Sequence, residues 1–359
     1  MYTSINLINM KLSDDLHIYG VVTIPILQNH TEWANRIWEA IDEFPEYKVK
    51  GKKAQRVLGG FGAYGNPSSF HHPTIRALRT ELKKNITPLF KHYTHSGYTT
   101  STHLEMLLDR VCVRYKDFGA VSKESWHRDV YEGDKNGLRK LPPSDDIFGG
   151  WVNLSENTQE FVCLIGTHND PHDGKKGFAP VKETEQLNRL LTTQANQTFG
   201  SAKTNSKGHI LVPPGHAVVF FQHILHAVLA GKPPTTPELR MFCGYRLAHD
   251  NNPLITHDLE NMTVPFIPSG QTPPMFSQNH YMFFNKFEKF RLWGEQTFNK
   301  ECLFARKTKE GEQTYYTPGS PIDQGNINLH RTMPSLKDMG FYFPPYTIEE
   351  VQILTPEPL

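Results

Sequence analysis

Three side chains of this sequence have the types and the order of a metal site. His127 and Asp129 are two positions apart, so in a strand or at its end they point to one face. His226 follows Asp129 by 97 residues and comes shortly after the apolar run 217–221. Two imidazoles and one carboxylate on an iron leave three positions open, which is the ligand set of non-haem Fe(II) oxygenases. The alternatives are a hydrogen-bonded His–Asp pair on the surface and His223 in place of His226.

Cationic side chains that could hold an acidic ligand occur on two predicted strands. Arg240 lies 14 residues after His226, and its guanidinium could bind the distal carboxylate of a dicarboxylate co-substrate by a bidentate fork. Arg246 lies on the same strand face because of its even spacing, so it is a second candidate for this role. Arg110 and Arg114 make one face of another strand cationic, as either a solvated face or a face that binds an anionic substrate.

The elements that must position these residues are short strands, which begin at about residue 104. They are predicted at 104–115, 149–154, 160–165, 210–212, 217–222 and 240–247. Short strands at regular spacing, separated by turn-rich loops, are typical of a sandwich or a barrel. Two long loops interrupt them, at 131–148 and 169–208, the second with a helix around 183–191. Loops of this length are usually functional lids or disordered, and we expect them to form a substrate lid.

Supporting elements precede these strands. A β-branched run that ends in a proline predicts a strand at 19–25. One amphipathic helix carries an apolar stripe of Trp33, Ile37, Ile41 and Phe44. A second helix begins at Pro73 and turns inward Ile75, Leu78, Leu82, Ile86 and Leu89. We expect one domain over 1–250, followed by a proline- and aromatic-rich extension, 251–359, which includes an aromatic helix within 275–298. The extension would pack on the core or on a partner, including a second copy of the chain.

The ordered pattern as a whole resembles the Fe(II)/2-oxoglutarate-dependent dioxygenases, and within them the phytanoyl-CoA dioxygenase-like family. The segments that carry the resemblance are Trp126-His127-x-Asp129, Gly150-Trp151-Val152-Asn153-Leu154, Leu164-Ile165-Gly166-Thr167-His168, Pro214-Gly215 through Phe220-Phe221 to Leu225-His226, and Arg240. The resemblance covers roughly residues 15–250.

This resemblance implies a mainly β, α+β fold with a double-stranded β-helix (jelly-roll) core. It also implies Fe(II) held by His127, Asp129 and His226, with 2-oxoglutarate as co-substrate and molecular oxygen as oxidant. Arg240 would bind the far end of 2-oxoglutarate, and Trp151 would form a wall of its pocket. The implied reaction hydroxylates an unactivated C–H bond and releases succinate and carbon dioxide.

Three features depart from the pattern of that family. His216 stands where an acidic residue is common, Val228 stands where a small hydroxyl residue is common, and the spacing from His226 to Arg240 is a few residues longer. These departures concern the co-substrate more than the metal. Two alternatives therefore stay open: a catalytically silent jelly-roll protein with a binding or structural role, and a cupin-type metalloenzyme that uses no 2-oxoglutarate.

Composition limits the class of protein. The 38 Lys and Arg residues balance 37 Asp and Glu residues, so no broad basic face for nucleic acid is expected. The four cysteines are far apart, which favours a reducing compartment. No apolar stretch approaches the length of a membrane span, and the N-terminus has no signal-peptide pattern. We therefore expect a soluble cytoplasmic enzyme acting on a small molecule, a lipid-like acid, a protein side chain or a nucleobase.

Overall fold

The structure is a computed structural model in which part of the chain is described. The described residues are 2–43, 57–58, 62–64, 68–91, 93, 102–114, 124–128, 146–170, 184–228, 235–248, 251–253, 259, 304–307, 313–316, 329–331 and 342–359. Asp129 and the helix predicted within 275–298 lie outside these residues.

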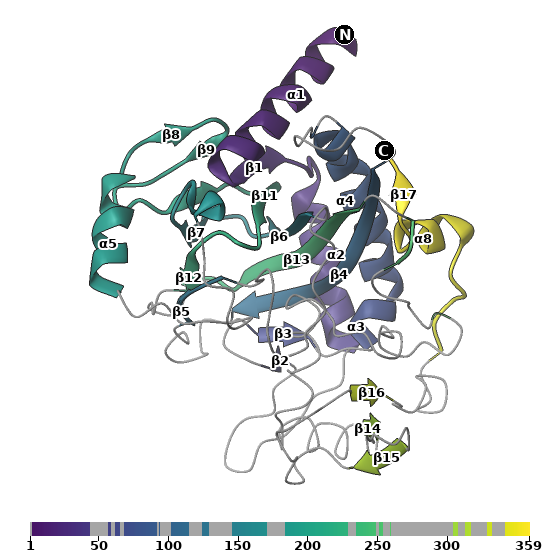
Figure 1. The fold of residues 1–359 in the computed structure, drawn as a ribbon. Coiled ribbons are helices and arrows are strands. Elements are labelled where there is room, and N and C mark those ends of the chain that lie inside the picture. Colours follow the sequence, from purple (N-terminus) through teal and green to yellow (C-terminus); the bar gives the residue numbers. More distant parts are fainter. Residues whose placement is uncertain are drawn as a thin grey trace.

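Two facing antiparallel sheets form the core of the molecule (Figure 1). Their eight core strands are, in chain order, β4 (His103–Arg114), β5 (Glu124–His127), β6 (Asp146–Asn153), β7 (Gln159–Cys163), β10 (Ile210–Val212), β11 (His216–Phe221), β12 (His226–Val228) and β13 (Glu238–Ala248). The major sheet has the order β11-β6-β13-β4, and the minor sheet has the order β10-β7-β12-β5. The chain therefore passes repeatedly from one sheet to the other, which is the winding of a jelly roll. The predicted mainly β, α+β fold with a double-stranded β-helix core is confirmed.

Further strands extend the edges of the major sheet. β1 (Val21–Pro25) pairs with β11, while β3 (Gly62–Tyr64) pairs with β4 and in turn with β2 (Val57–Leu58). β6 begins at Asp146, so the strand includes the last residues of the loop predicted at 131–148. The reason is that Phe148 continues the pleat and is buried among apolar side chains. Two small sheets join β8 (Thr198–Phe199) to β9 (Ala202–Lys203), and β14 (Phe304–Lys307) to β15 (Gln313–Tyr316) and β16 (Leu329–Arg331).

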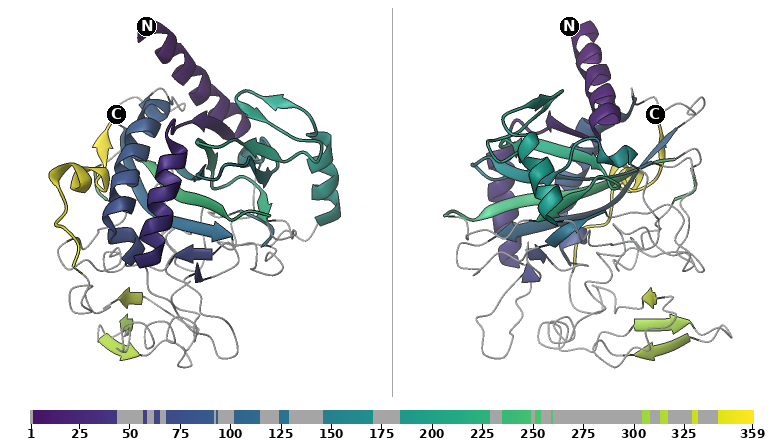
Figure 2. Two further views of the ribbon diagram at one scale, coloured as in Figure 1. Left: turned by 180° about the vertical axis from the view of Figure 1, so that it is seen from behind. Right: turned by 60° about the vertical axis from the view of Figure 1, so that its left-hand side comes forward.

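Helices cover the outer face of the major sheet (Figure 2). They are α2 (His30–Glu43) and α4 (Pro73–Lys91), with the short α3 (Ser68–His71) before α4. Helix α1 (Tyr2–Tyr19) packs at its C-terminal end and projects beyond the sheet at its N-terminal end. The apolar stripe predicted for α4, and the described part of the stripe predicted for α2, pack against alternate residues of the sheet, including Val152, Val219 and Met241. Phe44 of the predicted α2 stripe lies outside the described residues. Helix α1 is not among the predicted elements, and its Leu12 and Leu16 join the same cluster.

The outer face of the minor sheet is covered by α5 (Thr184–Thr193). Leu187 and Leu191 of this helix pack in one buried cluster with Trp126 and Leu225. Helix α5 belongs to the insertion predicted at 169–208, so the described part of that insertion covers a sheet. Residues 171–183 and 131–145 of the two predicted lid segments lie outside the described residues.

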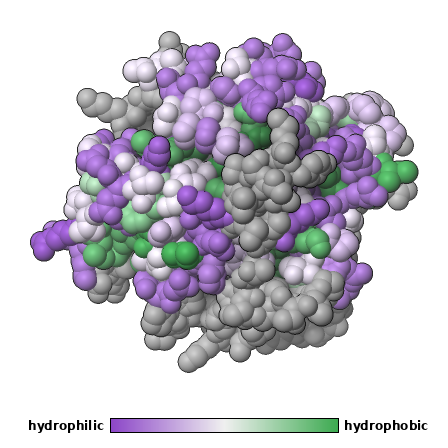
Figure 3. Space-filling view, turned by 90° about the horizontal axis from the view of Figure 1, so that it is seen from above, coloured by the Kyte–Doolittle hydropathy of each residue, from purple (hydrophilic) through white to green (hydrophobic). Residues whose placement is uncertain are grey.

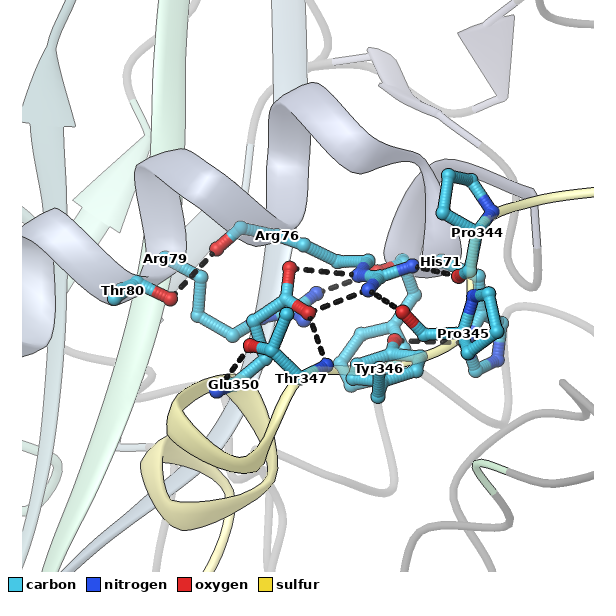
Figure 4. Close-up of polar contacts among 10 residues, drawn as sticks. His71, Arg76, Arg79, Thr80, Pro344, Pro345, Tyr346, Thr347 and Glu350 are labelled. Carbon is cyan, nitrogen blue, oxygen red and sulfur yellow. Dashed lines mark hydrogen bonds and ion pairs between the residues drawn. The ribbon is translucent and has the colours of Figure 1, made fainter.

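The last described segment, residues 342–359, is held on α4 and β4 (Figure 4). Arg76 donates hydrogen bonds to the carbonyls of Pro344 at 2.6 Å and Pro345 at 2.8 Å, and its Nε donates to Glu350 at 3.0 Å. Its guanidinium also lies 3.9 Å from the ring centre of Tyr346. The helix α8 (Ile348–Ile353) and the strand β17 (Glu357–Pro358), which pairs with β4, complete the segment. These contacts place this part of the C-terminal extension on the core of its own chain.

The described surface is mainly polar, as expected when apolar side chains are buried in a core. Figure 3 shows mainly hydrophilic residues over the face seen from above, with hydrophobic residues in separate small patches. In the ranges given above, no helix combines the length and apolar character that crossing a membrane requires.

Candidate functional site

Two histidines meet between the sheets on neighbouring strands. β5 and β12 are antiparallel, and their register places His127 directly opposite His226. The two ring centroids are 4.2 Å apart, and the residues are 2% and 7% exposed. Side chains alternate along a strand, so Trp126 and Leu225 point to the outer face while the two imidazoles point inward. Two buried imidazoles at this separation can bind one metal ion together.

The hydrogen bond of His226 fixes which ring nitrogen is available to a metal. Its Nδ1 lies 3.0 Å from the carbonyl oxygen of Ile224. A carbonyl only accepts, so Nδ1 carries the proton and donates it, and the lone pair is on Nε2. This is the usual outer partner of a metal-binding histidine, and it fits the donor set that Fe(II) requires.

The third predicted ligand, Asp129, lies outside the described residues, two positions after the end of β5. In the part of the chain that the structure describes, no group of three or more His, Cys, Asp or Glu side chains could hold a metal. His223 lies in the turn before β12, and the strand register aligns His226 with His127 instead. The structure thus brings together two of the three predicted ligands.

Arg128 is a site residue that the sequence analysis missed. Its side chain points to the outer face and is buried, with the residue 5% exposed. Its Nη1 donates to the carbonyl of Thr167 at 2.6 Å and also to the carbonyl of His223. It therefore fastens the end of β5 to the turn that leads into β12 and His226. Arg128 stands between two predicted ligands, so its side chain must point to the opposite side of the strand, and this alternation could have indicated a supporting role.

An aromatic floor supports the histidine pair. The ring of Phe220 stacks on Phe161 at 4.5 Å between centroids and lies 5.4 Å from the ring of His226. Gly149 is directly opposite Phe220 on the neighbouring strand, and a Cβ there would lie 2.8 Å from two ring atoms. The absence of a side chain at Gly149 is therefore a condition for the position of Phe220.

Arg240 projects from the inner face of β13. Its Cζ lies 3.9 Å from the ring centre of Trp151, so the guanidinium stacks on the indole. Burial, together with the charge of nearby Arg114, lowers the pKa of Arg240. An arginine keeps its proton in proteins, and a buried cation beside a second arginine is a location that favours a bound anion.

Arg246, the other predicted anion anchor, has a buried carboxylate as its partner. Its Nη1 donates to Glu105 at 3.0 Å and to the carbonyl of Asn252 at 2.9 Å. Arg246 is 1% exposed and Glu105 is fully buried. Separating such a pair leaves an uncompensated charge and costs about 3–5 kcal/mol. Arg246 is therefore held by a buried carboxylate, whereas Arg240 stacks on an aromatic ring.

Asn153, which the sequence analysis quoted only as part of a motif, fixes the end of β6. Its Nδ2 donates to the carbonyls of Val212 at 2.8 Å and Asn157 at 2.9 Å, and its Oδ1 accepts from the Ser155 amide at 2.9 Å. The side chain is fully buried and joins the two sheets. Trp151 lies two residues earlier on the same face of this strand.

Comparisons with known proteins give only distant likenesses. No protein-family model matches the chain, and no curated protein matches it in sequence. Among solved structures, the non-haem α-ketoglutarate-dependent carbocyclase SnoK from nogalamycin biosynthesis shares 13% identity over 66% of this chain and 82% of its own, with a TM-score of 0.43. EctD from S. alaskensis with 2-oxoglutarate and 5-hydroxyectoine shares 12% over 65% and 74%, with a TM-score of 0.41. HygX from Streptomyces hygroscopicus with iron bound shares 14% over 64% and 83%, with a TM-score of 0.37. The strand order given above, and not this likeness, identifies the fold.

Proposed function

We propose that this chain is an Fe(II)- and 2-oxoglutarate-dependent oxygenase that hydroxylates an unactivated C–H bond, within the phytanoyl-CoA dioxygenase-like family. The observation that supports this most directly is the pairing of His127 and His226, with ring centroids 4.2 Å apart on neighbouring strands of the minor sheet. The sequence supplies the carboxylate of Asp129 two residues after His127.

In this proposal His127, Asp129 and His226 hold the iron. The bound iron, with 2-oxoglutarate and oxygen, supplies the oxidation of the C–H bond, while the co-substrate becomes succinate and carbon dioxide. The protein orients the ligands: the Ile224 carbonyl keeps the proton of His226 on Nδ1, so that the lone pair of Nε2 would be available to the iron. The apolar floor of Phe220 and Phe161 limits the access of water on one side.

Arg240 is the anchor that we assign to the distal carboxylate of 2-oxoglutarate. Its guanidinium stacks on Trp151, which the family resemblance places in the wall of the co-substrate pocket. Arg246 would first have to leave Glu105, which is fully buried beside it at 3.0 Å. The cost of separating that pair makes Arg246 the poorer anchor.

Anaerobic titration with Fe(II) and then 2-oxoglutarate tests the proposal, because bidentate binding of the keto acid to iron produces a visible charge-transfer band. We expect a saturable band in the full-length protein and none in the Asp129→Ala or His226→Ala variant. His223→Ala is the matched control, since it removes the rival imidazole and should leave the band intact. A band that survives Asp129→Ala but is lost in His223→Ala would overturn the ligand assignment.

The co-substrate anchor is tested in the same titration. Arg240→Ala should retain iron but need at least about tenfold more 2-oxoglutarate, since a charge-assisted pair contributes about 1.5–3 kcal/mol. Arg246→Ala should instead destabilise the fold. If iron binds without any band, the chain is a cupin-type metalloenzyme that does not use 2-oxoglutarate. If no iron binds, a catalytically silent jelly-roll protein is the correct description.

A further inference from the structure

We propose that the inner face of β4 and β13 binds an anionic group of the substrate, a carboxylate or a phosphate, through Arg110. This inference rests on the proposed function, because it assigns Arg240 to the co-substrate and names the class of substrate for the same site.

Strand register gathers three arginines on this face. Arg110 and Arg114 point to the same side of β4. Val111 and Val113, which lie between them, point to the other side and pack in the apolar cluster beneath the helices. Arg240 of β13 lies opposite Cys112, and therefore between the two arginines of β4. The three arginines are therefore neighbours on one face of the sheet.

Aromatic rings hold two of these guanidinium groups. The Cζ of Arg110 is 4.8 Å from the ring centre of Phe242, which lies directly opposite it, and Arg240 stacks on Trp151 in the same way. A stacked guanidinium keeps its N–H edge available for a planar or tetrahedral anion. Arg110 is half-buried, and its Nε is buried without a hydrogen-bond partner among the residues that the structure describes.

The charges of the iron, its ligands and 2-oxoglutarate can be balanced without Arg110, so Arg110 could bind another anion. In the loaded site, the dianionic co-substrate and one aspartate exceed the charge of Fe(II) by one, and Arg240 balances that excess. Arg114 has Glu238 at 3.6 Å. The guanidinium of Arg110 has no ion-pair partner within the described ranges. Its charge in a partly desolvated location favours a further anion.

Arg110 lies on the same inner face of the major sheet as the aromatic ring that contacts His226. Phe220, which touches His226, covers Gly149, while Trp151, Phe242 and Arg110 form the next row on the same face of the sheet. A substrate held by its anion at Arg110 would therefore lie over this inner face, toward which His127 and His226 point.

Calorimetric titration of the full-length protein, loaded anaerobically with Fe(II) and 2-oxoglutarate, tests this inference. The probes are hexanoate and hexyl phosphate, with hexanamide and hexylamine as neutral and cationic counterparts of the same chain length. We expect at least one anion to bind about tenfold or more tightly than hexanamide, the effect of one charge-assisted pair. Comparison of the two anions identifies which oxyanion the site prefers.

Two variants show whether Arg110 is responsible. In Arg110→Gln the preference for the anion should fall to near one, while the charge-transfer band with 2-oxoglutarate persists. Arg36→Gln is the matched control, because Arg36 is also half-buried and lies 4.1 Å from the ring centre of Trp33, but on helix α2 outside the barrel. It should keep the full preference.

Three results would overturn the inference: no anion preference in the wild-type protein, the same preference in Arg110→Gln, or loss of the 2-oxoglutarate band in Arg110→Gln. The last result would assign Arg110 to the co-substrate. Absence of the band in the wild-type protein would instead refute the proposed function. The anion preference would then be measured on the metal-free chain, where its dependence on Arg110 decides the inference separately.

Discussion

Replacement of Arg128 by methionine should both destabilise the fold and weaken metal binding by the histidine pair. Arg128 joins the end of β5 to the Thr167 and His223 carbonyls, and His223 lies three residues before His226. Methionine keeps most of the apolar stem and removes the cation together with its donors. The two carbonyls then lose a charged partner in a location where water has little access.

The size of the effect follows from the contacts of Arg128. Hydrogen bonds to a charged group contribute about 1.5–3 kcal/mol each, and two carbonyls are involved. The additional pair with Asp170, at 3.9 Å and with the Asp170 side chain 57% exposed, contributes little. We therefore expect Arg128→Met to lower the free energy of unfolding by about 3–6 kcal/mol. Loss of a residue that orients a metal ligand typically weakens metal binding about 10–100-fold.

Urea unfolding of the metal-free protein and titration with Fe(II) measure the two effects. Lys83→Met is the matched control, because Lys83 is a buried cation that donates to the carbonyls of Ile353 at 3.0 Å and Thr355 at 3.3 Å, in the C-terminal segment. Both variants should be less stable, and only Arg128→Met should bind Fe(II) more weakly. Equal loss of metal affinity in the two variants, or an unchanged urea midpoint for Arg128→Met, would refute the reasoning.

Two further predictions concern other contacts of the site. Gly149→Ala should cost about 1–3 kcal/mol and weaken Fe(II) binding, because the new Cβ would lie 2.8 Å from the ring of Phe220 and displace it toward His226. Phe220→Leu in the same chain should restore part of both losses, in urea unfolding and in metal titration. Burial lowers the pKa of His168 below its ordinary value of 6.5, so the unfolded state takes up this proton first as the pH falls. Stability should therefore decline between about pH 7.5 and pH 5.5, and by less in His168→Phe, when urea midpoints are compared at both values; an unchanged decline would contradict this assignment.

Periodicity in the sequence predicted the elements that rest on local patterns. The five residues expected to face inward from the helix beginning at Pro73 are all buried in the structure. The long strands β4 and β13 begin and end within two residues of the predicted ranges, because apolar and polar residues alternate along them. The proposed ligand residues could be identified in the same way, because the two-residue spacing of His127 and Asp129 and the apolar run before His226 are local features.

Features that depend on distant contacts were not predictable. Helix α1 was missed because serine, asparagine and aspartate interrupt its apolar residues, and its two buried leucines are explained only by the helices and sheet they touch. The hold of Arg76 on Pro344 and Glu350 joins positions more than 260 residues apart. No periodicity within one segment reports such a pair.

The position of Arg128 has a physical reason in the division of tasks between the two faces of the minor sheet. β5 and β12 have four and three residues, too few to fix His127 and His226 by backbone pairing alone. The space in front of the imidazoles cannot be filled by packing side chains if a metal and a co-substrate are to enter it. The two histidines must therefore be held in place from the outer face of the minor sheet. There α5 packs on Trp126, and Arg128 donates hydrogen bonds to two backbone carbonyls. On this reasoning, Arg128, which stands between two of the proposed metal ligands, acts from the face of the strand that a metal would not touch.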